Sequence, residues 1–136
     1  MYSSIKSAII AKLEAITGIK KIYGYEKGDL DGFPAATVVL VGIEAPILDN
    51  VSDSRRYDFR IRLYQEMEED GVGAEEAESR VDALIDTLIG TFEDDYRLGG
   101  LAYNTNLKVE MGYPDRGPSM RVFDMTLEVY AIYQLT

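Results

Sequence analysis

The chain has 136 residues and a formal net charge of −10, with 46% hydrophobic and 28% charged residues. This composition predicts one soluble globular domain, residues 1–136, that folds in the cytoplasm, because no apolar run approaches the ~20 residues of a membrane-spanning helix. The sequence contains neither cysteine nor histidine, which excludes disulfides, zinc–thiolate sites and histidine-based catalysis, and its acidic balance opposes binding to nucleic-acid phosphates.

The first part of the sequence predicts a helix followed by two strands. Apolar residues at steps of three and four indicate an amphipathic helix, which Ser3 or Ser4 would cap and Gly18 would end. Loosely alternating β-branched and aromatic residues predict a strand within 19–25. The continuous apolar run 36–43 is typical of a central strand covered on both faces.

The third predicted strand, Ser54–Tyr64 (SRRYDFRIRLY), carries four of the fourteen basic residues of the chain. Strict alternation predicts a half-buried strand with a basic outer face, because Tyr57, Phe59, Ile61 and Leu63 alternate with Arg56, Asp58, Arg60, Arg62 and Tyr64. This face has three open interpretations. Its arginines could pair with Glu110, Asp124 or Glu128 on neighbouring strands, contact another protein, or contact nucleic acid. Arginine and tyrosine are enriched at protein interfaces, which favours the second use over the third.

The second part of the sequence predicts another helix and two more strands. An apolar stripe between 77 and 92 indicates a helix that ends before Asp94, and strands are expected at 101–111 and 120–133. The predicted order is therefore α-β-β-β-α-β-β. Because short connections favour hairpins, we expect an α+β two-layer sandwich, with two helices on one face of a mostly antiparallel sheet of about five strands. The other face of the sheet would carry charged residues and tyrosine.

No pattern in the sequence predicts a catalytic, metal or cofactor site. The turn Gly71-Val72-Gly73 lies between a strand and a helix, as in dinucleotide-binding proteins, but Glu76 occupies the position of the third small residue. The segment Asp29-Leu30-Asp31-Gly32 lacks the later ligands of a calcium loop. We therefore expect no enzyme activity, no cofactor and no metal.

Six segments match a known pattern in chain order: AITGIKKIYGY, GFPAATVVLVG, RRYDFRIRLYQE, AEEAESRVDALIDTLIG, DDYRLGG and MRVFDMTLEVYAIYQ. With the order of elements, they resemble the tail terminator (tail-completion) proteins of long-tailed bacteriophages. The resemblance spans nearly the whole chain and is one of pattern, without a catalytic signature. It implies an α+β protomer that forms a ring, typically a hexamer, on the head-proximal end of the tail tube in the virion. There the ring would stop tube polymerisation and offer a surface to head-completion proteins.

A closed ring needs a heterologous contact, in which one surface of each subunit meets a different surface of the next. The basic strand and the acidic run that follows it are our candidates for these two surfaces. The candidate interface residues are Arg55, Arg56, Arg60, Arg62 and Tyr64 on one side and Glu66, Glu68, Glu69 and Asp70 on the other.

The predicted polar loop 44–54 is long for a hairpin and is our candidate for contact with the tail-tube protein, through Pro46, Ile47, Leu48, Asp49 and Asn50. Genome DNA would pass through the bore without specific binding, because a negative lumen repels phosphate. Two alternatives stay open. The chain could be a head–tail connector of the neck, which is also ring-forming, or a small α+β ligand-binding domain or enzyme that uses Tyr, Arg and carboxylates in a pocket.

Overall fold

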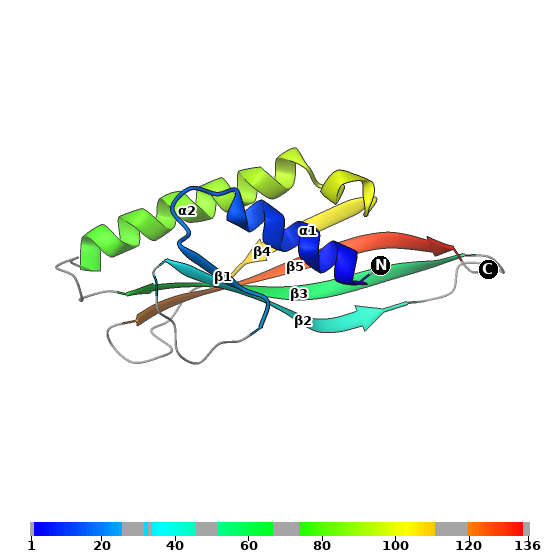
Figure 1. The fold of residues 1–136 in the computed structure, drawn as a ribbon, viewed down its shortest axis with the longest axis horizontal. Helices are drawn as coiled ribbons and strands as arrows, with labels where there is room; N and C mark the ends of the chain where they lie inside the picture. Colours follow the sequence, from blue (N-terminus) through cyan, green and yellow to red (C-terminus); the bar gives the residue numbers. More distant parts are fainter. Residues whose placement is uncertain are drawn as a thin grey trace.

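The computed structural model describes residues 2–25, 32, 34–45, 52–66, 74–110 and 120–134 of the chain. In these segments two α-helices lie on the same side of one five-stranded sheet (Figure 1). The helices are α1 (Tyr2–Glu14) and α2 (Ala74–Asp94), and the strands are β1 (Lys21–Tyr23), β2 (Ala35–Glu44), β3 (Ser52–Glu66), β4 (Asn104–Val109) and β5 (Met120–Gln134). This arrangement confirms the predicted α+β fold and the predicted order of elements.

The strands follow the order β1-β2-β3-β5-β4 across the sheet, so β3 is the central strand. The pairs β2–β3, β3–β5 and β5–β4 are antiparallel, as expected, whereas β1 is parallel to β2. The α2 helix carries the chain from β3 to β4, and β5 then returns between these two strands. Among the described strands, β1 and β4 therefore form the two edges of the sheet.

The hydrophobic core lies between the helices and the sheet. Residues four positions apart on α1 are buried, and α2 contributes a similar stripe, which comprises Val81, Leu84, Leu88 and Phe92. Alternate residues of the long strands complete this core: Tyr57, Phe59, Ile61 and Leu63 of β3 and Phe123, Met125, Leu127, Val129 and Ala131 of β5. Fully burying one large apolar side chain contributes about 1.5–3 kcal/mol, so this interleaved set is the main source of stability.

The helix ends differ from the sequence predictions. The α1 helix begins at Tyr2, so the predicted cap at Ser3 or Ser4 is wrong, and both serines lie in the first turn. The ring of Tyr2 stacks on two core aromatic rings of β3, at centroid distances of 6.4 Å and 6.0 Å, and this contact favours the longer helix. The α2 helix includes Asp94 instead of ending before it. No helix in the described part of the chain is both long and apolar enough to cross a membrane.

The β2 strand is covered on both faces only in its first part. Residues 35–38 are buried, whereas Val41 and Ile43 are exposed, so the prediction of a strand covered along its length is half correct. The reason is the short neighbouring strand. The β1 strand pairs with β2 only from Ala35 to Thr37, so the rest of β2 has no described strand on its outer side.

Candidate interaction surface

The face of the sheet away from the helices carries charged residues and tyrosine, as predicted. We call it the open face, because none of the described helices or strands packs on it (Figure 1). Residues directly opposite each other on antiparallel strands share a face, and this register brings the polar residues of three strands together. They are Arg56, Asp58, Arg60 and Arg62 of β3, Asp124, Thr126, Glu128 and Tyr130 of β5, and Asn104, Asn106 and Lys108 of β4.

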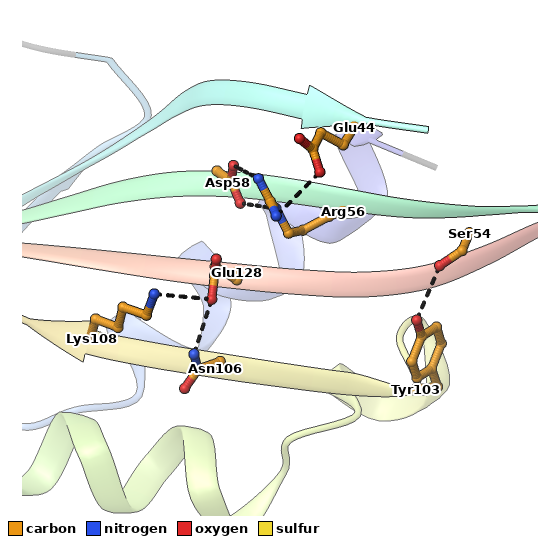
Figure 2. Close-up of polar contacts among 8 residues, drawn as sticks. All are labelled: Glu44, Ser54, Arg56, Asp58, Tyr103, Asn106, Lys108 and Glu128. Carbon is orange, nitrogen blue, oxygen red and sulfur yellow. Dashed lines mark hydrogen bonds and ion pairs between the residues drawn. The ribbon is translucent and has the colours of Figure 1, made fainter. Parts of the chain in front are cut away.

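Arg56 is held by two carboxylates of its own subunit. Its Nε donates to Asp58 Oδ1 at 3.0 Å and its Nη2 donates to Asp58 Oδ2 at 3.2 Å, while its Nη1 lies 3.2 Å from Glu44 Oε2 (Figure 2). The hydrogen bond to Asp58 is the main cause of the raised pKa of Arg56. A β-bulge between Leu40 and Gly42 shifts the register of β2 and pairs Glu44 with Arg56 across the strands. The bulge therefore completes this ion-pair cluster.

Glu128 lies directly opposite Asp58, so two like charges face each other across β3 and β5. Glu128 is stabilised from the other side. Asn106 Nδ2 donates to its Oε1 at 2.9 Å, and Lys108 Nζ lies 3.7 Å from the same oxygen (Figure 2). The hydrogen bond from Asn106 and the nearby Lys108 and Arg56 charges lower the pKa of Glu128, although partial burial acts in the opposite direction. Both facing carboxylates are thus paired with donors.

The two remaining arginines of the open face have different surroundings. Arg62 Nε donates to Asp124 Oδ1 at 2.6 Å, and the two residues are opposite in register, which confirms the predicted cross-strand pairing for this arginine. Partial burial by itself would lower the pKa of Arg62, but its hydrogen bonds to Asp124 and Tyr64 outweigh burial and raise it. Arg60 lies opposite Thr126, is exposed, and forms no ion pair with any described residue. Its guanidinium is therefore available to another molecule.

Large apolar side chains are exposed at one end of the sheet, where β2 and β5 finish and β4 begins (right in Figure 1). We call this set the apolar end; it comprises Val41, Ile43, Leu101, Tyr103 and Ile132. Each of these side chains is between 39% and 50% exposed. A group of large exposed apolar side chains in one region of a protein is a candidate surface for another molecule.

Tyr103 links the apolar end to the open face. Its hydroxyl oxygen lies 3.1 Å from Ser54 Oγ in a hydrogen bond that spans β5 (Figure 2). Its ring packs on that of Tyr130, with the centroids 6.2 Å apart. Tyr130 in turn lies opposite Arg56 in register. An arginine and two tyrosines held in place beside exposed aliphatic residues form a combination that is common at the centres of protein interfaces.

A groove of about 410 Å³ lies between α2 and the edge strand β4. It is lined by Ile89, Phe92, Glu93, Tyr96, Thr105, Asn106 and Leu107. Its lining includes one carboxylate and one phenol but no arginine, so it does not contain the combination of groups that the enzyme alternative requires. Within the part of the chain that the structure describes, no group of carboxylates is placed to hold a metal ion.

The structure separates the predicted interface residues. Arg56, Arg60 and Arg62 share the open face of the central strand, so they lie on a face of the sheet rather than at an edge. Arg55 lies on the helix side, where its Nη1 donates to the Tyr57 hydroxyl at 3.2 Å, and Tyr64 is fully buried. The side chains of Glu66, Glu68, Glu69 and Asp70 lie outside the described residues, as do the loop residues Pro46, Ile47, Leu48, Asp49 and Asn50.

Sequence reasoning missed the apolar end. Val41 and Ile43 belong to an apolar run that predicts burial, and Ile132 belongs to a strand of alternating pattern. The alternation in β5 could have revealed Ile132, because it places this residue on the face of Tyr130 and Glu128. The exposure of Val41 and Ile43 leaves no sequence signal, because it depends on where β1 stops pairing with β2.

No protein-family model matches the chain, and no curated protein matches it. Among solved structures, a similar chain belongs to a structure described as "Virion of native gene transfer agent (GTA) particle". The two chains share 15% sequence identity, the alignment covers 94% of each, and the TM-score is 0.49. A similarity this distant concerns the course of the backbone at most, so the functional proposal rests on the surfaces described above.

Proposed function

We propose that this chain is a structural protein of a phage-like virion that forms a ring of six copies on the head-proximal end of the tail tube. In this role the ring ends tube polymerisation and provides the surface that joins the head. The proposal combines the resemblance in sequence pattern with one structural observation, the apolar end. Five large side chains gather at a single end of the sheet, which suits a protomer that binds a tube through that end.

The location of the apolar end supports this role. The β2 strand ends and the β3 strand begins there, and these two strands flank the predicted tube-contact residues 46–50 in the sequence. Side chains of β2, of β5 and of the residues just before β4 would then bind the tube together with that loop. The internal ion pairs of Arg56 and Arg62 make the neighbouring open face a pre-formed surface, which reduces the entropy lost on binding.

The experiment is a tube-capping assay with purified components. The chain is added to polymerising tail-tube subunits of the same virus, and tube lengths and tube ends are measured by negative-stain electron microscopy. We expect shorter tubes that carry a ring at one end, with a bore of about the ~20 Å width of duplex DNA or more. Tubes of unchanged length with bare ends would contradict the proposal.

The neck-connector alternative is tested by affinity purification. A tagged chain is expressed with tail-tube subunits and, separately, with portal or adaptor subunits. The tail-terminator role requires retention of tube subunits under conditions in which portal subunits are not retained. The reverse result would assign the chain to the neck instead.

A further inference from the structure

The two edges of the sheet carry opposite charges. At the β1 edge, Lys20 and Lys21 are exposed, and neither forms an ion pair with a described residue. At the β4 edge, Glu93 and Glu110 are exposed, and they too have no ion-pair partner among the described residues. Since the charges of the open face other than Arg60 are mostly paired within the subunit, these edge charges are available for a contact between copies.

Both edge strands also have a free side. Among the described strands, β1 pairs only with β2, and β4 pairs only with β5. The outer backbone N–H and C=O groups of an edge strand can pair with a strand of another chain. Natural proteins often guard such edges with lysine, and this is the rival explanation for Lys20 and Lys21.

The strand directions allow the two edges to join. The β4 strand runs antiparallel to β5, which is antiparallel to β3, and β3 is antiparallel to β2. The β1 strand is parallel to β2, so β1 and β4 run in opposite directions within one subunit. A rotation about an axis roughly parallel to the strands preserves these directions. It would therefore place the β1 of one copy antiparallel to the β4 of the next, which is the more stable kind of strand pairing. The contact falls at the end of β4, near Val109 and Glu110, because β1 is level with residues 122–124 of β5 and Val109 is level with Met125.

Charge distinguishes this arrangement from a two-fold dimer. A β4-to-β4 contact would bring Glu93 and Glu110 towards the same residues of the other copy, and a β1-to-β1 contact would do the same with Lys20 and Lys21. Only the β1-to-β4 contact brings unlike charges together. Because it uses two different surfaces, it is heterologous and can close into a ring.

We infer that copies of this chain join edge to edge, with β1 of one subunit added to β4 of the next, so that Lys20 and Lys21 face Glu93 and Glu110. This inference rests on the proposed ring function and specifies the joint of the ring.

The test uses reversed charges at both edges. In the first variant, Lys20→Glu and Lys21→Glu make both edges acidic, and in the second, Glu93→Lys and Glu110→Lys make both edges basic. Assembly is measured by sedimentation velocity and native mass spectrometry over a range of concentrations up to those at which the wild type forms rings. We expect each variant alone to need at least about tenfold higher concentration to assemble, because two attractive pairs become repulsive.

Mixing the two variants supplies the decisive control. Each acidic edge then meets a basic edge of the other variant, so the mixture should form alternating rings with an even number of subunits. A single chain that carries all four substitutions should also assemble, since its β1 is acidic and its β4 is basic. A β4-to-β4 dimer would not be restored in that quadruple variant, because its two lysine-bearing edges would repel.

The outcomes separate this joint from the proposed function. If both charge variants form rings as readily as the wild type, the proposed β1-to-β4 contact is wrong, whereas the proposed ring function is unaffected. A wild-type chain that stays monomeric at every concentration, and also on tail tubes, would overturn both, with the lysines then acting only as edge guards.

Cross-linking gives a second readout that does not depend on charge repulsion. The chain has no cysteine, so a disulfide can form only at introduced positions. Lys21→Cys combined with Glu110→Cys, or Tyr23→Cys combined with Lys108→Cys, places both thiols on the open-face side of the proposed joint and at nearly the same level along the strands. Oxidation should give a ladder of covalent oligomers for at least one pair. The matched control combines Lys21→Cys with Arg60→Cys on the central strand and should give no ladder. Absence of a ladder from both edge pairs would contradict the proposed contact.

Discussion

At the scale of single residues, the open face contains both paired and free charges. Arg62 pairs across strands with Asp124, and Arg56 pairs with Asp58 of its own strand and with Glu44 of β2, so contacts within the subunit explain these two arginines, whereas Arg60 remains available. Polar contacts on this face also affect the protonation of Glu128. Glu128 is stabilised as a carboxylate by Asn106 and Lys108, and its pKa is lower than the ordinary 4.5. A lowered pKa means that this carboxylate stabilises the folded state when it is ionised.

Glu128→Gln should therefore lower stability in a pH-dependent way. The contribution of a carboxylate with a depressed pKa is complete above its unfolded-state pKa, and it is lost as the pH falls through its folded-state pKa. We expect the substitution to cost about 0.5–1 kcal/mol at pH 7 and to have little effect once the pH is well below the ordinary value of 4.5. Urea denaturation of both proteins across this pH range measures the difference. Glu110→Gln, at an exposed position without an ion pair, is the matched control, and an equal cost in the two variants would contradict the prediction.

At the scale of elements, the sequence predicted the helices, the long strands and their order, because each has a clear period. The alternation in β3 and β5 and the stripe on α2 follow from burial on one side, which the pattern records directly. The parallel pairing of β1 and the bulge in β2 leave no such signal, since both depend on which strands become neighbours in space. The surface was predicted less well: Arg55 and Tyr64 share a strand with Arg56, but the first faces the helix side and the second is buried.

Substitutions at two glycines test how backbone conformation affects the stability of the helices and turns. Gly90 lies inside α2, and an added Cβ there meets nothing within 4 Å, so Gly90→Ala should stabilise the protein by about 0.5–1 kcal/mol. Gly18, in the turn after α1, has φ +112°, and a Cβ there would lie 3.2 Å from Leu84 Cδ2. Gly18→Ala should therefore destabilise by about 1 kcal/mol or more. Thermal and urea denaturation of the two variants should give opposite signs, and a stabilised Gly18→Ala variant would contradict the assigned turn.

At the scale of the whole molecule, different parts of the surface face in different directions and carry different kinds of residue. The edges of the sheet lie at its sides and carry unlike charges, whereas the apolar end lies at one extremity of the strands. A ring whose axis is roughly parallel to the strands would use the edges for contacts between copies and would present every apolar end to the same side. This division predicts that lateral assembly and binding to the tube can be disrupted separately by substitutions at different places.

The last prediction tests the apolar end by itself. Ile43→Ser with Ile132→Ser removes two exposed aliphatic side chains from different strands, and substitutions at such exposed positions usually change stability by no more than about 0.5 kcal/mol. If the apolar end binds the tube, affinity for tail-tube subunits should fall about thirtyfold to a thousandfold, because each of the two buried side chains contributes roughly 1–2 kcal/mol at an interface. Ring formation without tubes should remain. Tyr25→Ser is the control, because Tyr25 is also exposed (58%) but lies away from the apolar end. It follows β1, which pairs with the part of β2 near the other end of the long strands. Biolayer interferometry measures the affinity of each variant for the tube. An unchanged affinity in the double variant would show that another surface binds the tube.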